Sequence, residues 1–182
     1  MKKTHKCLLY IVIGIILQTA IILIFVLTFM RARTPKLRFG SVSVQTLTTN
    51  SSTSSPSFTM KLNTQITVKN TNFGKFKFGD STATMYYKGI PIGEAAIGKG
   101  KAKARSTKKV DVSVSLSSNK VTSGNLNLAS DLNSGKLRLT SQGTLKGKVH
   151  LLKVIRRKKT AEMNCYMDVN TKTKAVENLH CK

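Results

Sequence analysis

Apolar and polar residues alternate along three stretches of the chain, a pattern typical of β-strands with one buried face. The stretches cover residues 60–68, 110–116 and 163–169. In the first of them, Met60 and Leu62 share one face, and Lys61 and Asn63 share the other. Because successive side chains on a strand point to opposite faces of a sheet, these stretches predict antiparallel strands over a shared core.

Further strands are predicted by shorter apolar stretches, which are separated by breaks that contain glycine. The stretches are 38–47, 82–88, 92–98, 136–141 and 144–154, and the breaks lie at Gly79, Gly89, Gly135 and Gly143. A short helix is indicated between residues 121 and 132, and residues 48–57 form a polar loop between the first two strands. About seven strands with one helical insert predict an all-β domain, a sandwich like that of immunoglobulin or fibronectin type III domains.

A different pattern precedes this domain, because residues 8–30 carry no charged side chain. A helix of that length extends about 34 Å, enough to cross a hydrocarbon layer of about 30 Å. A cleaved signal peptide is the alternative, but arginines at positions 31 and 33 stand where a cleavage site needs small residues. We therefore predict a tail at 1–7, a single transmembrane helix at 8–30 and the β-domain at 31–182.

The charge of the chain is strongly unbalanced. Its 182 residues include 31 Lys and Arg against 7 Asp and Glu, a net charge of +24 at pH 7. Such a chain is drawn to polyanions and to anionic membrane surfaces. Seven carboxylates, three His and three Cys argue against an acidic metal cage and against a zinc or iron cluster, so we expect no metal and no cofactor.

Two features that resemble catalytic motifs do not predict an enzyme. The stretch from Gly93 to Gly100 comes within one residue of a phosphate-binding P-loop, but Gly100 stands where that motif needs Ser or Thr. The motif also needs a strand before it and a helix after it, whereas the stretch that follows, residues 101–105, is short and flanked by strands. These glycines therefore indicate a bend or bulge between strands. His150 and His180 show no spacing that suggests a Ser–His–Asp triad. We expect no catalytic residues.

The densest group of cations lies between residues 153 and 159. Its candidate contacts for an anionic surface are Lys153, Arg156, Arg157, Lys158 and Lys159. A nuclear localisation signal or nucleic-acid patch is disfavoured by the membrane segment and by the lack of an aromatic stacking platform. A solvated hairpin between two strands is the favoured interpretation, and contact with anionic lipid headgroups is the third.

The placement of the cysteines bears on topology, because basic residues flank the span almost equally on both sides. A cytosolic N-terminus would separate Cys7 from Cys165 and Cys181, which could then form one bridge outside the cytosol. Unpaired thiols in a cytosolic domain are the alternative. Asn50 begins an Asn-Ser-Ser sequon suited to glycosylation, and Cys7 is a candidate for S-palmitoylation beside the membrane.

Two segments resemble a plant family. Val68 to Phe76 and Met85 to Gly93 are similar to late embryogenesis abundant proteins of the second subgroup, which includes the harpin-induced, hydroxyproline-rich-glycoprotein-like membrane proteins. The end of the chain resembles small plant members too, at 143–149, 161–165 and 178–181. Members of the family usually have proline where this chain has Thr71.

The resemblance implies a fibronectin-like sandwich behind a single span, with no catalytic residues. It also implies a part in stress and defence responses, often at the plasma membrane, and the sandwich of the family is discussed as a lipid-binding module. We therefore expect a non-enzymatic, single-pass protein whose basic domain lies outside the cytosol and binds a partner, an anionic lipid or an acidic cell-wall polysaccharide. The alternative is a lipid-binding or lipid-transfer module with an apolar cavity between its sheets.

Overall fold

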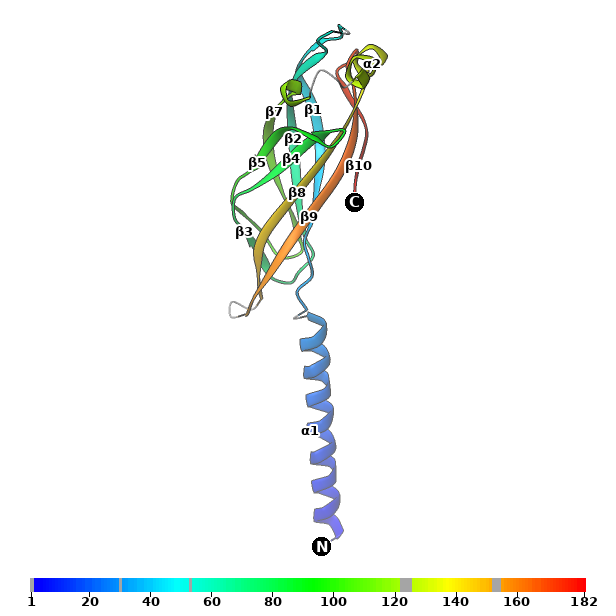
Figure 1. Cartoon of the computed structure of the whole chain (residues 1–182). Coiled ribbons are helices and arrows are strands. Elements are labelled where there is room, and N and C mark those ends of the chain that lie inside the picture. Colours follow the sequence, from blue (N-terminus) through cyan, green and yellow to red (C-terminus); the bar gives the residue numbers. More distant parts are fainter. Residues whose placement is uncertain (1, 30, 53, 122–125, 152–154) are drawn as a thin grey trace. The chain divides into compact units, whose positions relative to one another are not determined.

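The computed structural model describes residues 2–29, 31–52, 54–121, 126–151 and 155–182 (Figure 1). The chain divides into two compact units, residues 1–33 and residues 34–182. The predicted hairpin turn and Lys153 lie outside the described residues.

The first unit is one apolar helix, α1 (Lys2–Phe29). Its segment His5–Thr28 is long and apolar enough to cross a membrane, a property that a signal sequence shares. Two threonines in this segment bond to the helix itself, and the Thr19 hydroxyl donates to the carbonyl oxygen of Ile16 at 2.8 Å. Thr28 donates in the same way to the carbonyl oxygen of Ile24 at 2.7 Å. Both hydroxyls thereby meet the demand that a bilayer places on buried polar groups.

The second unit is built mainly of β-strands in two sheets (Figure 1). One sheet has the order β1-β2-β7, and the other has the order β10-β9-β8-β3-β6, with β4 paired to β5 and to β8. The strands are β1 (Lys36–Asn50), β2 (Ser57–Asn70), β3 (Lys75–Phe78), β4 (Ser81–Tyr87), β5 (Ile90–Ile97), β6 (Gly100–Ala102), β7 (Ser106–Ser117), β8 (Lys136–Leu151), β9 (Ile155–Asn170) and β10 (Ala175–Cys181). A 3-10 turn, η1 (Ser118–Lys120), and a helix, α2 (Leu126–Ser134), follow β7.

The core is formed by the inward positions of strands from both sheets. Met60 and Leu62 of β2 are at most 1% exposed, and so are Phe76 of β3, Leu139 of β8 and Met163 of β9. The alternation in the sequence thus predicts the buried face of β2, β7 and β9 correctly. It does so because burial on one face of a strand selects apolar residues at every second position.

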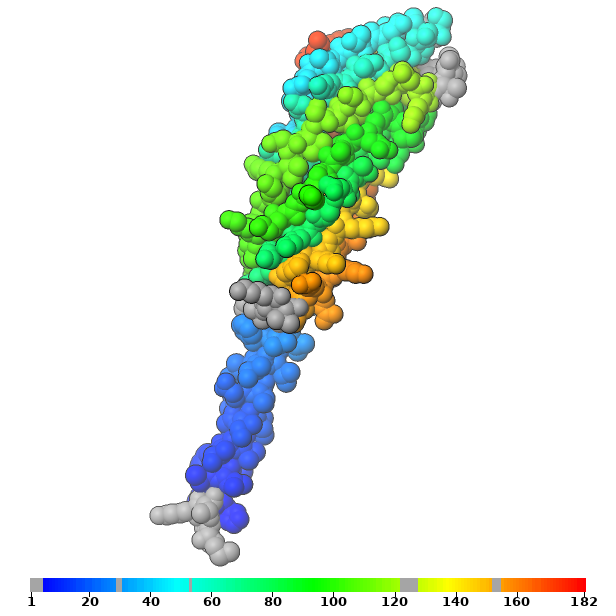
Figure 2. Space-filling view, turned by 90° about the vertical axis from the view of Figure 1, so that its left-hand side faces the viewer, coloured from blue at the N-terminus to red at the C-terminus, as the bar shows by residue number. Residues whose placement is uncertain are grey.

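The two sheets adjoin where β5 lies beside β7 (Figure 2, green and yellow-green). A Cβ atom added to Gly93 would lie 2.5 Å from the carbonyl oxygen of Ser115, so only glycine permits this approach. A bulge between Met85 and Tyr86 of β4 lies opposite the same stretch of β5. A bulge of the predicted kind is thus present beside Gly93, in the pairing of β4 with β5.

Gly143 does not end a strand, and this prediction is wrong. β8 continues through it for 16 residues, since Gly143 pairs with Met163 on one side and with Ala83 on the other. A Cβ atom there would lie 3.0 Å from the Cβ atom of Ala83, so the glycine serves close strand contact. Gly89 and Gly135 do lie in turns, with φ of 85° and 81°, which favour glycine.

Several other boundaries shift. The loop predicted at 48–57 is narrower, because Thr48, Thr49 and Asn50 belong to β1 and Ser57 begins β2. The sequence patterns do not predict the strands β3, β6 and β10, and the predicted helix is present as α2. The basic residues at 155–159 lie along β9, which pairs with β8 in an antiparallel hairpin.

Candidate anion-binding face

Four lysines lie opposite one another across four neighbouring strands of the larger sheet. Lys101 of β6 pairs with Lys77 of β3, which pairs with Lys148 of β8, which in turn pairs with Lys158 of β9. All four side chains are exposed. We call Lys77, Lys101, Lys148 and Lys158 the lysine row. Because paired residues point to the same side of a sheet, their ammonium groups emerge from one face.

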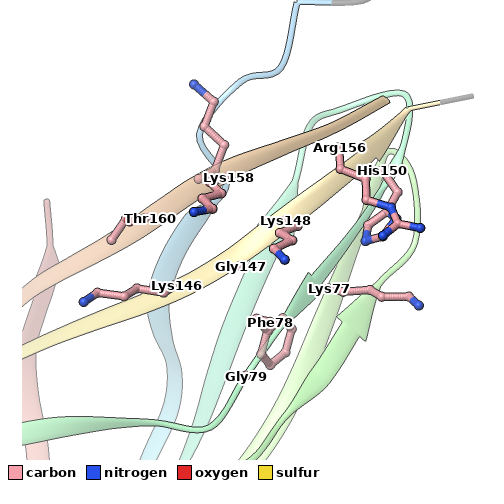
Figure 3. A pocket seen from close by; sticks show the side chains of 11 residues that line it. Lys77, Phe78, Gly79, Lys146, Gly147, Lys148, His150, Arg156, Lys158 and Thr160 are labelled. Atoms are coloured by element: carbon pink, nitrogen blue, oxygen red, sulfur yellow. The ribbon is translucent and has the colours of Figure 1, made fainter. Parts of the chain in front are cut away.

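A second set of cations lies one step further along the same strands. Lys75 of β3 pairs with His150 of β8, which pairs with Arg156 of β9. Figure 3 shows His150 and Arg156 close together on this face, with Lys77 and Lys148 beside them. An open cavity of about 540 Å³ lies on the outer face of these three strands, and its lining is Lys77, Phe78, Gly79, Lys146, Gly147, Lys148, His150, Arg156, Lys158, Lys159 and Thr160.

The lining of this cavity contains no carboxylate. The salt bridges among the described residues lie elsewhere and join Lys88 to Asp131 and both Lys136 and Arg138 to Asp168. Like charges directly opposite one another destabilise a sheet. The lysine row therefore carries an electrostatic cost that no neighbouring acid among the described residues offsets.

The pKa of His150 is sensitive to the positive charges on this face. Burial lowers the pKa of its imidazole, and the charges of Lys77 and Arg156, with those of Lys75 and Lys148, lower this pKa further. The imidazole is therefore held neutral at a pH where an ordinary histidine begins to take up a proton. An anion bound on the same face would raise the pKa of His150.

Asn70 positions two of the strands that carry the lysine row. Its buried amide donates to the carbonyl oxygens of Gly74 at 2.8 Å and Lys103 at 2.9 Å. Gly74 directly precedes β3, and Lys103 directly follows β6. The Asn70 Oδ1 atom also accepts bonds from the backbone N–H and the side-chain amide of Asn72. One side chain thus fixes the start of β3 and the end of β6.

Gly74 brings β3 close to β8. A Cβ atom at this position would lie 1.9 Å from the carbonyl oxygen of His150, so no other residue fits without a backbone shift. This close approach precedes Lys75 and His150, which pair with one another. Glycine at 74 is therefore part of the geometry that brings the cations of β3 and β8 together.

The structure places three of the predicted contact residues in the cavity lining, namely Arg156, Lys158 and Lys159. Arg157 is exposed on β9 opposite Val149 and is not among the lining residues. Sequence reasoning missed Lys77, Lys101, Lys146 and Lys148, which come from segments far away along the chain. For Lys77, Lys146 and Lys148, a signal exists in the alternating lysines of KFKF at 75–78 and KGKV at 146–149.

The other predicted sites lie apart from this face. The Sγ atoms of Cys165 and Cys181 are 1.98 Å apart and link β9 to β10. Asn50 is exposed at the end of β1, where its Oδ1 atom accepts a bond from the backbone N–H of Ser52 at 3.2 Å. Cys7 is an exposed free thiol on α1.

The P-loop-like stretch lies mainly in strands. Gly93 belongs to β5, and Gly100 begins β6. The backbone N–H of Lys99 donates to the Asp80 carboxylate at 2.7 Å, so an acid already occupies a donor that a phosphate would need. In the part of the chain that the structure describes, no group of three or more His, Cys, Asp and Glu side chains is placed to hold a metal.

Comparison with known proteins gives a family. The model of the late embryogenesis abundant protein family LEA_2 matches residues 65–166. A late embryogenesis abundant protein of Arabidopsis thaliana is 31% identical over 182 residues, covering 97% of this chain and 83% of the relative.

Solved structures match with low similarity. A solution structure of an Arabidopsis thaliana protein has a TM-score of 0.46 and 16% identity, covering 77% of this chain and 83% of its own. A crystal structure of a protein from Archaeoglobus fulgidus has a TM-score of 0.37 and 12% identity, covering 70% of this chain and 94% of its own.

Proposed function

We propose a membrane-anchored, anion-binding role for this chain, which belongs to the late embryogenesis abundant family and is a stress-related protein of plant type. In this role the chain acts without catalysis, in stress or defence responses at the plasma membrane. Its apolar helix holds it in the bilayer, and its basic β-unit binds an anionic partner. The observation that carries the proposal is the cationic face of β3, β8 and β9, whose cavity no carboxylate lines.

Membrane anchoring is supported by α1. Its apolar segment of 24 residues is long enough for a full span, and its threonine hydroxyls bond within the helix. Arginines at 31 and 33, directly after the span, favour retention over cleavage. We assign the segment to a retained single-pass anchor.

The β-unit is assigned to the outer side of the plasma membrane. Cys165 and Cys181 form a disulfide bond, and disulfide bonds persist in oxidising compartments and are rare in the cytosol. Asn50 is exposed in its sequon, as a glycan requires. We propose that Asn50 carries a glycan, and that Cys7, on the cytosolic side, is available for S-palmitoylation.

We assign the β-unit to the fibronectin-like sandwiches. A three-stranded sheet and a larger, mainly antiparallel sheet enclose a core formed by both, which is the general plan of such domains. The inward residues of this core are almost fully covered by one another. Packed side chains leave the outer face of the larger sheet as the binding surface, in preference to an apolar cavity between the sheets.

An acidic cell-wall polysaccharide is the partner that this topology favours. The outer side of a plant plasma membrane faces the wall, and a strongly cationic unit attracts polyanions there. Anionic lipid is the second source of negative charge. Lysine is suited to either, because its ammonium group acts as a compact point charge without a fixed binding geometry.

Salt dependence tests the proposal. The full chain in a neutral detergent should co-sediment with polygalacturonate at low ionic strength and lose most of this binding at 1 M salt, where the screening length falls to about 3 Å. Neutral dextran of similar length serves as the control. Binding that persists unchanged at high salt, or no binding at low salt, would remove the electrostatic account.

A further inference from the structure

The lysine row has the geometry of a track for a linear polyanion. Neighbouring strands in a sheet lie about 4.8 Å apart, so four paired lysines extend over about 14 Å at right angles to the strands. Lys77, Lys101, Lys148 and Lys158 therefore form a line of regularly spaced positive charges. We propose that the lysine row is a binding site for a linear polycarboxylate that crosses β6, β3, β8 and β9. This inference rests on the proposed function and names the place and the ligand class.

Charge complementarity is the first argument for this site. Paired like charges are unfavourable in a sheet, and real sequences depart from such local rules chiefly at functional sites. The described residues provide no ion pair to any member of the row, since their salt bridges involve only Lys88, Lys136 and Arg138 as cations. A ligand with repeated negative charges would supply the missing partners.

The identity of the cations is the second argument. All members of the row are lysines, whereas recognition of a single phosphate or carboxylate by a fixed pair of bonds is typical of arginine. A row of flexible ammonium groups suits charges that recur along a chain. Arg156, beside His150, lies one step away and widens the positive face without interrupting the row.

The floor of the site leaves room for a polymer. Gly79 directly follows β3 and is a lining position without a side chain, and a Cβ atom added there would meet nothing within 4 Å. The cavity of about 540 Å³ is open (Figure 3). A chain that crosses the strands could therefore run past the row without having to enter the core.

A triple variant tests the row against a control of equal charge. Lys77→Gln, Lys148→Gln and Lys158→Gln together remove three charges from the row. Lys61→Gln, Lys69→Gln and Lys109→Gln remove three exposed charges from the three-stranded sheet. With about 1 kcal/mol for each lysine near an anionic surface, the row variant should bind polygalacturonate on the order of 100-fold more weakly at low salt. The control variant should lose no more than about threefold.

Two further measurements keep the result interpretable. The row variant should unfold at the same or a higher temperature than the wild type, because like charges have been removed from paired positions. Polygalacturonate should raise the pKa of His150 in the wild-type chain, measured by NMR of the imidazole and assigned with His150→Gln. A pKa of His150 that stays unchanged at saturation would place the ligand elsewhere.

The possible failures can be distinguished. No binding by the wild-type chain would overturn the proposed function itself. Equal losses in the two triple variants would leave anion binding in place and overturn the row as its site. Vesicles of phosphatidylcholine with and without phosphatidylserine test the other source of charge. Row-dependent binding to the anionic vesicles, without binding to polygalacturonate, would overturn the polycarboxylate assignment in favour of lipid headgroups.

Discussion

Replacing Asn70 by alanine is expected to lower the free energy of unfolding by about 3 kcal/mol or more, since each buried group left without its bond costs about 1–3 kcal/mol. Asn70 is 1% exposed and bonds to carbonyl oxygens before β3 and after β6, and to the backbone N–H of Asn72. Alanine would remove all of these bonds and leave the two carbonyl oxygens and the backbone N–H of Asn72 without this partner. Chemical denaturation of the full chain in neutral detergent measures the change. Far-ultraviolet circular dichroism is the probe, because the chain contains no tryptophan for fluorescence.

The matched control is Asn63→Ala, an asparagine of the same strand that is half-buried. It should cost less than about 1 kcal/mol, as substitutions away from buried networks usually do. The Asn70 variant should also weaken anion binding, because the strands that carry Lys77 and Lys101 lose their common anchor. Equal stability of the two variants would show that the Asn70 network contributes little.

Replacing Asp168 by asparagine is expected to lower the free energy of unfolding by about 2 kcal/mol at neutral pH. The carboxylate is 2% exposed and accepts bonds from Arg138 at 2.9 Å and from Asn178 at 3.0 Å, with Lys136 at 3.2 Å. It thereby joins β8, β9 and β10. The two cations are largely exposed, which keeps the expected loss below that of a fully buried ion pair.

The carboxylate of Asp168 also makes the stability of the fold depend on pH. The hydrogen bond from Arg138, with those from Asn178 and Lys136, holds the pKa of Asp168 well below its usual range. A lowered folded-state pKa contributes stability that is fully present above the unfolded value of about 3.9 and is lost as the pH falls below it. The difference in the free energy of unfolding between the wild type and the Asp168→Asn variant should therefore shrink as the pH is lowered from about 5 to about 2.

Asp111→Asn is the control for this series. Asp111 is exposed on β7 and accepts one bond from the Gln65 amide at 2.9 Å. Its removal should change stability by less than about 0.5 kcal/mol at any pH, as is usual for exposed polar positions. A difference at Asp168 that stays constant with pH would contradict a charged, bonded carboxylate at that position.

The sequence predicts this fold wherever burial is one-sided and local. In β2, Met60, Leu62 and Ile66 alternate with polar residues because one face of the strand covers the core. Turns at Gly89 and Gly135 are predicted for a similar reason, because a positive φ at one residue is a local requirement that glycine meets. These features depend on neighbours within a few residues along the chain.

Features that depend on distant segments could not be predicted in this way. Gly143 looks like a strand break in the sequence, yet it serves contact with Ala83, 60 positions earlier. β3 has only four residues and is defined by its partners β6 and β8. A short strand of this kind carries too few positions for a period of two to be recognised.

The candidate site shows the same limit. The cluster at 153–159 is visible as a run of cations, but the residues that complete the face come from β3, β6 and β8. Lys101 and Lys158 are joined into one row only by the register of three strand pairs. Register follows from pairing across the whole sheet, so the row is a property of the fold.

The proposed position of the basic β-unit outside the cytosol is tested most directly by thiol labelling on intact cells. A membrane-impermeant maleimide should label Cys165 and Cys181 only after mild reduction, without opening the membrane. Cys7 should label only once the membrane is opened. Labelling of Cys165 and Cys181 that requires an opened membrane and no reductant would place the unit in the cytosol and contradict the account.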